Sequence, residues 1–100
     1  MGQPNRIKRV FGDVSSEIFA KLRKDFVNAG FIDMSEEFPG RGRNVVIEIS
    51  YKISSGYIPL FCWVRTEQKL IIDFYDPNPG MSQETITQVY ALLSKNNFKI

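Results

Sequence analysis

The chain has 100 residues, of which 43% are hydrophobic and 24% charged, values typical of one soluble globular domain. Its formal net charge of +2 is too small to indicate a surface that follows nucleic-acid phosphates or an anionic membrane. It contains no histidine, which excludes serine–histidine and cysteine–histidine nucleophile pairs and most zinc sites. We therefore predict one domain over residues 1–100, without catalytic residues, metal site or cofactor.

The single cysteine, Cys62, cannot form an internal disulfide, so the sequence favours a reducing compartment. No apolar run reaches the roughly 18 residues of a membrane span, and the first residues lack the apolar segment of a signal peptide. We expect a cytoplasmic protein with no membrane partner.

The first 30 residues predict an optional strand followed by a helix. Residues 1–5 are expected to form a flexible tail, and residues 6–11 an optional short strand. In the helix that follows, apolar residues recur at three- and four-residue spacing. They are Ile18, Phe19, Leu22, Phe26 and Val27. This face of the helix is expected to pack on the core.

Both ends of this helix carry sequence signals. Asp13, Ser15 or Ser16 can cap its start by accepting hydrogen bonds from free backbone N–H groups. Gly30 ends it, because glycine adopts a left-handed conformation without a Cβ clash. Phe31 should then fold back against the last helical turn.

The next segments predict a strand and a basic loop. Residues 31–38 are expected to form the first strand of the main sheet, with Glu36 and Glu37 making its far end polar, as on an edge. The loop at 39–43 contains two glycines and one proline, which are typical of a turn.

Three consecutive strands are predicted at 44–53, 57–65 and 69–75, joined by hairpin-length loops. The first has an apolar face of Val45, Ile47, Ile49, Tyr51 and Ile53. The middle strand is apolar on both sides. One side has Ile58, Leu60, Cys62 and Val64, and the other Tyr57, Phe61 and Trp63. Pro59 removes one ladder donor, which indicates an edge position or a bulge at the start of this strand.

In the last strand, Leu70, Ile72 and Phe74 continue the aliphatic face opposite Ile71, Asp73 and Tyr75. A turn at 76–80 ends the sheet, and Ser82 can cap a final helix. The apolar face of that helix consists of Ile86, Val89, Tyr90 and Leu93. Asn96 and Asn97 offer a left-handed stop, after which Phe98 can return to the core.

Together these elements predict an α+β two-layer sandwich. A four-stranded antiparallel meander, with an optional N-terminal strand, would carry two helices on one face in the order (β)-α-β-β-β-β-α. The helices can cover the aliphatic face only. The other face should remain open, although a shift of one residue in register would exchange the two faces.

The open face is the first candidate site, because an aromatic patch with a charged rim is typical of a protein-binding surface. The candidate residues are Tyr57, Phe61, Trp63, Ile71, Asp73 and Tyr75. The alternative is that the N-terminal segment, or a second copy of the chain in a homodimer, covers this face.

A basic set is the second candidate, for contact with an anion or nucleic acid. It comprises Arg6, Lys8, Arg9, Arg41 and Arg43. The carboxylates of Asp73, Asp76 and the Glu36-Glu37 pair could hold magnesium or perform acid/base work, but Asp76 before Pro77 is typical of a turn former.

The functional prediction is a small non-catalytic module that binds another protein and acts by occlusion. Toxin-neutralising immunity proteins and phage-encoded inhibitors, which target a toxin or a host enzyme, are of this kind by size and surface only. The alternative is a nucleic-acid-binding or regulatory domain that uses the basic set.

Overall fold

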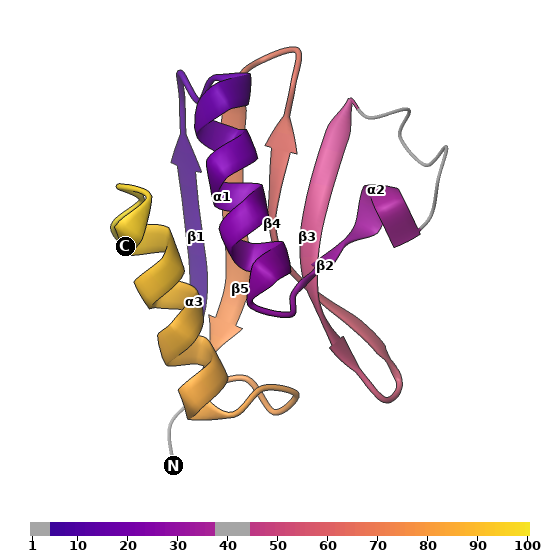
Figure 1. The fold of residues 1–100 in the computed structure, drawn as a ribbon. Coiled ribbons are helices and arrows are strands. Elements are labelled where there is room, and N and C mark those ends of the chain that lie inside the picture. The colour runs from indigo at the N-terminus through magenta and orange to yellow at the C-terminus, as the bar shows by residue number, and fades with distance from the viewer. Residues whose placement is uncertain (1–4, 38–44) are drawn as a thin grey trace.

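The computed structural model describes residues 5–37 and 45–100. The predicted tail, apart from Asn5, and the predicted loop at 39–43, with Arg41 and Arg43, lie outside the described residues. The elements in order are β1 (Asn5–Phe11), α1 (Ser16–Asn28), β2 (Ile32–Asp33), α2 (Met34–Glu37), β3 (Val46–Ile53), β4 (Gly56–Val64), β5 (Lys69–Asp76) and α3 (Gln83–Lys95) (Figure 1). None of the helices in these ranges combines the length and apolarity needed to cross a membrane.

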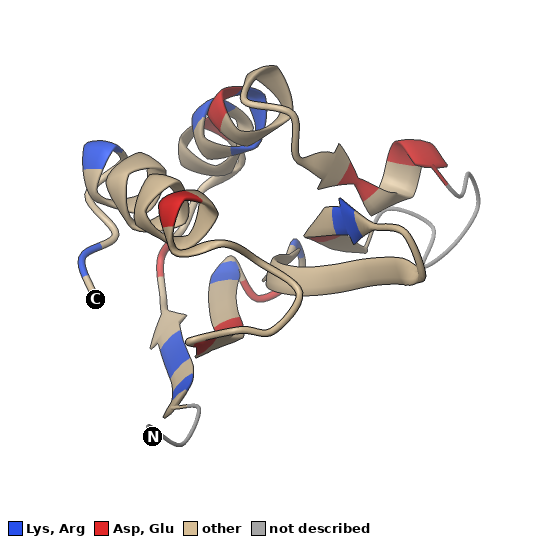
Figure 2. Ribbon diagram, turned by 90° about the horizontal axis from the view of Figure 1, so that it is seen from below, with Lys and Arg blue, Asp and Glu red and all other residues tan. Residues whose placement is uncertain are grey.

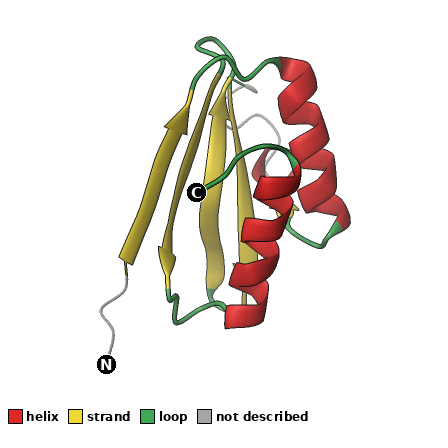
Figure 3. Cartoon of the chain, turned by 90° about the vertical axis from the view of Figure 1, so that its left-hand side faces the viewer, coloured by secondary structure: helices red, strands yellow, loops and turns green. Residues whose placement is uncertain are grey.

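The strands form one five-stranded antiparallel sheet in the order β1-β5-β4-β3-β2. Both long helices, α1 and α3, lie on the same face of this sheet (Figure 3). The predicted α+β class with an antiparallel sheet is therefore confirmed. In detail the sheet has five strands, and β1 pairs along its whole length with β5 as an edge strand.

The predicted strand at 31–38 is wrong in most of its length. Only Ile32 and Asp33 pair with β3, and the short helix α2 follows at once. Asp33 causes this change, since its Oδ1 accepts hydrogen bonds from the Ser35 backbone N–H at 2.9 Å and from the Ser35 hydroxyl at 2.6 Å. Such local bonds from an aspartate favour a turn over continued pairing. Arg23 pairs with the other oxygen of this buried carboxylate.

The predicted helix ends are confirmed for α1. The Ser15 hydroxyl accepts a hydrogen bond from the backbone N–H of Ile18 at 3.2 Å. At the other end Gly30 has φ +99°, and the Phe31 N–H donates to the carbonyl of Phe26 at 3.0 Å. The two phenylalanine rings lie 5.1 Å apart, as expected when a helix ends in a Schellman motif.

The buried face of α1 is narrower than predicted. Phe19, Leu22 and Phe26 are buried, whereas Ile18 and Val27 are exposed. Positions 18 and 27 lie on the two flanks of the apolar stripe, where the side chains are 45% and 39% exposed. The core therefore receives three large side chains from this helix.

Helix α3 also begins and ends as predicted. The Ser82 hydroxyl accepts from the Thr85 backbone N–H at 3.1 Å, and Asn97 has φ +68°. Phe98 then returns to the core, where its ring lies 5.1 Å from that of Phe11 on β1. This contact ties the end of α3 to the edge strand.

A β-bulge in β4 overturns the predicted division of its side chains. Ile49 of β3 pairs with Phe61, but the next residue, Ser50, pairs with Pro59. Leu60 is thus the extra residue, and beyond it the alternation of β4 is shifted by one. The side chains on the helix-covered side are Ile58, Leu60, Phe61 and Trp63, while Cys62 and Val64 lie on the opposite side.

Phe61 and Trp63 of β4 consequently lie beneath α1. The Trp63 ring stacks on Phe19 at a centroid distance of 4.8 Å, and Phe61 meets Phe26 edge to face at 4.8 Å. Trp63 also donates from Nε1 to the carbonyl oxygen of Val14 at 2.9 Å. The expectation that Phe61 and Trp63 lie on the open face is therefore wrong, and they belong to the core.

Candidate protein-binding face

The sheet face opposite α1 and α3, here called the open face, is not covered by any element in the described ranges (Figure 3). Residues 5–11 do not cover it, contrary to one alternative from the sequence, because β1 pairs in the plane of the sheet at its edge. The open face is therefore formed by β1, β5, β4 and β3.

Aliphatic side chains and one thiol form a band across four strands of this face. This apolar strip consists of Val10, Ile71, Cys62, Val64 and Val46. Val10 pairs with Ile71, and Ile71 with Cys62. Val10 is 56% exposed and Val46 43%, while the other members are half-buried. The strip is contiguous because each neighbour is a cross-strand pair or two residues along one strand.

Charged groups border the apolar strip. Arg6 donates to both carboxylate oxygens of Asp73, from Nε at 2.9 Å and from Nη2 at 2.7 Å. These hydrogen bonds lower the pKa of Asp73 and raise that of Arg6. Lys8 lies directly opposite Asp73 in the β1–β5 register. This end of the face therefore holds two positive charges around one carboxylate.

Cys62 occupies the middle of the apolar strip. Its thiol has a raised pKa, chiefly because partial burial disfavours the thiolate and further because Glu48 and Asp73 repel it. At neutral pH the residue is a neutral thiol, which suits an apolar contact and not a nucleophile.

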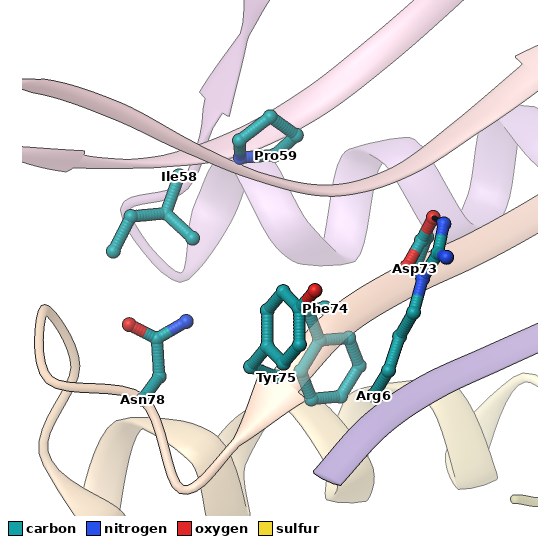
Figure 4. Close-up of a pocket in the computed structure, with 7 residues that line it drawn as sticks. All are labelled: Arg6, Ile58, Pro59, Asp73, Phe74, Tyr75 and Asn78. Atoms are coloured by element: carbon teal, nitrogen blue, oxygen red, sulfur yellow. Dashed lines mark hydrogen bonds and ion pairs between the residues drawn. The ribbon is translucent and has the colours of Figure 1, made fainter. Parts of the chain in front are cut away.

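A hollow lies in the gap where β4 and β5 separate, lined by open-face residues such as Asp73 and Tyr75 and also by Ile58 and Phe74 of the covered side. The β4–β5 ladder covers only the stretch from Phe61 to Val64. Residues 56–59 of β4 pair with β3 and not with β5, and residues 73–76 of β5 pair with β1 and not with β4. Two adjoining cavities of about 440 Å³ and 130 Å³ fill the gap, and both are lined by Pro59 and Asp73. Figure 4 shows the larger one, with Tyr75 between the Arg6–Asp73 pair and Asn78.

The predicted protein-binding residues divide into three groups. Ile71, Asp73 and Tyr75 lie on the open face, with Tyr75 48% exposed. Tyr57 pairs with Lys52 at the start of β4, and its hydroxyl donates to Glu37 at 2.8 Å. The remaining two, Phe61 and Trp63, are buried in the core.

The predicted basic set is not gathered into one surface. Arg6 and Lys8 lie on the open face, but Arg9 pairs with the buried Ile72 and so lies on the other side of β1. Figure 2 shows the basic residues of β1 beside the acidic residues of β5. Since Arg6 is held by Asp73, the described part of the set offers few free positive charges.

Four members of the apolar strip were missed as site residues. Cys62 and Val64 were assigned to the core face, and Val10 and Val46 were not singled out. Pro59 is the sequence signal that could have identified them. A proline cannot donate to the ladder and therefore indicates either an edge position or a bulge. Choosing the bulge would have placed Cys62 and Val64 on the open face.

Among residues 5–37 and 45–100, no group of three or more histidine, cysteine, aspartate or glutamate side chains could hold a metal ion. The comparisons with known proteins add no assignment. No protein-family model matches the chain, and neither the curated proteins nor the solved structures contain a match.

Proposed function

We propose that the protein is a small non-catalytic binding module that docks its open face onto another protein and occludes the surface it covers. The observation that carries this proposal is the apolar strip, which crosses four strands and is not covered by any element of residues 5–37 and 45–100. Contiguous exposed apolar surface with a polar border is typical of a protein interface. Neutralisation of a toxin and inhibition of a host enzyme both work by such occlusion, and they remain the classes that we propose.

The chemistry of the open face favours a protein partner over nucleic acid. Phosphate binding needs uncompensated positive charge, whereas the Arg6 guanidinium is engaged by Asp73. Stacking of successive bases needs several exposed aromatic rings, but Phe61 and Trp63 are buried and Tyr75 contributes a single exposed ring. Aliphatic side chains dominate what is left, and these gain most from contact with another apolar surface.

Affinity capture with paired baits tests the proposal. Ile71→Glu places a charge in the centre of the apolar strip, and Val10→Glu places one at its exposed end. Gln88→Glu is the matched control, because Gln88 is exposed on α3, on the opposite layer. We expect wild-type and Gln88→Glu proteins to retain a common partner and both strip variants to lose it while unfolding at unchanged urea concentrations.

Two results would contradict the proposal. A partner retained equally by all four baits would place binding away from the open face. A dimeric mass in light scattering, reduced to a monomer by Ile71→Glu, would assign the open face to a second copy of the chain.

A further inference from the structure

The smaller cavity of the open face combines apolar walls with two carboxylates, one of which has no ion pair within the part of the chain that the structure describes. Its lining includes Glu48, Pro59, Cys62, Ile71 and Asp73. Both oxygens of Asp73 are engaged by Arg6. Glu48, in contrast, has no ion-pair partner within residues 5–37 and 45–100.

The walls of this cavity are fixed by the bulge. Leu60 and Phe61, both buried, form its floor, and Pro59 stands at its junction with the larger cavity. The larger cavity is closed on one side by the loop that follows β5, where Gly80 lies so near Ile58 that a Cβ would meet Ile58 Cδ1 at 2.5 Å. The hollow thus has a narrow end that is lined by Glu48 and a wide end beside Tyr75, which Figure 4 shows.

We infer that this hollow receives an extended segment of the protein partner and that a lysine or arginine side chain of that segment enters the smaller cavity and pairs with Glu48. Long basic side chains suit such a cavity, because their aliphatic stems cover apolar surface while the charged end meets the carboxylate. The wide end, with Tyr75, Ile58 and Pro59, would take an apolar side chain of the same segment. The inference rests on the proposed function and names its partner chemistry.

Selection from a randomised peptide display library tests this inference. Peptides are selected on the wild-type protein and counter-selected on Ile71→Lys protein, because a positive charge in the lining of the smaller cavity repels a basic side chain. We expect the retained peptides to share one basic residue, and its replacement by norleucine to weaken binding about tenfold or more, as for other charge-assisted hydrogen bonds. Protection of the Cys62 thiol from alkylation reports that the peptide lies on the open face.

A double-mutant cycle assigns the basic residue to its partner. In Glu48→Gln protein the same norleucine replacement should change binding little, whereas in Glu84→Gln protein, altered on the opposite layer, it should cost as much as in wild type. Unchanged urea unfolding of Glu48→Gln protein shows that the fold is retained.

The outcomes separate this inference from the proposed function. Retained peptides without a common basic residue, or an equal norleucine effect in Glu48→Gln protein, overturn the lysine or arginine assignment while docking on the open face stands. A library with no peptide that depends on Ile71 overturns segment binding altogether. Failure of the proposed function itself is decided separately by the four-bait capture.

Discussion

The two faces of the sheet carry different kinds of side chain. The covered face is built from large rings and branched side chains that interlock with α1, as Trp63 does with Phe19. The open face is built from smaller aliphatic groups, a thiol and paired charges, as at Ile71 and the Arg6–Asp73 pair. Large aromatic residues in a strand therefore do not by themselves indicate a binding surface, because helix packing uses them equally well.

The largest expected effect is on the covered face. Trp63→Ala removes the stack on Phe19 and the hydrogen bond to Val14, and should lower the free energy of unfolding by about 3–5 kcal/mol. Urea unfolding followed by circular dichroism measures this loss. Tryptophan fluorescence cannot be used, because Trp63 is the only tryptophan and the variant lacks it. Tyr75→Ala, on the open face, is the comparison and should cost far less. Equal losses would mean that the two faces are not distinct.

A second pair of substitutions sharpens the comparison within one strand. Leu60 and Val64 share a side in simple alternation, but the bulge buries Leu60 and leaves Val64 half-buried on the open face. Leu60→Ala should cost about 2–5 kcal/mol as a large-to-small core change. Val64→Ala should cost less than about 1 kcal/mol, as is usual near a surface. The reverse order in urea unfolding would contradict the register.

The ion pair of the open face should show itself in the pH dependence of unfolding. The pKa of Asp73 is lowered in the folded state, so the pair stabilises the fold above the unfolded pKa of about 3.9. This contribution is lost as pH falls through the lower folded value. Asp73→Asn should remove that part of the acid dependence, and salt should weaken it in wild type. An Asp73 pKa at or above 3.9 by NMR titration would contradict the pairing.

The smallest expected effect concerns the thiol in the apolar strip. Glu48→Gln removes one of the two carboxylates that raise the pKa of Cys62, so the pKa should fall slightly while burial still holds it above the ordinary value. Alkylation of the folded protein at pH 8 should then become modestly faster than in wild type. A Glu84→Gln control should leave the rate unchanged. A slower reaction in Glu48→Gln protein would show that Glu48 does not face the thiol.

Local chemistry in the sequence predicted much of the fold. The helix caps at Ser15 and Ser82, and the left-handed stops at Gly30 and Asn97, were predictable because each depends on neighbouring residues alone. The strands beyond residue 45 were predictable from their apolar content.

The candidate site was less predictable, because it depends on register. β4 is apolar on both sides, so its pattern does not distinguish a regular strand from one with an extra residue at Leu60. Only the pairing with Ile49 and Ser50 settles which side chains are covered. In the same way, the bonds of Asp33 to Ser35 replaced a predicted strand with a turn of helix, which no apolar pattern indicates.

The position of β1 has a consequence for how the chain folds. Its partners on β5 lie about 60 to 70 residues further along the chain, and forming such a long loop is slow. During synthesis β1 would leave the ribosome well before any residue of β5 exists. Through that interval its backbone is unpaired, and the positive charges of Arg6, Lys8 and Arg9 disfavour pairing with other nascent chains, as charged residues do on exposed strand edges.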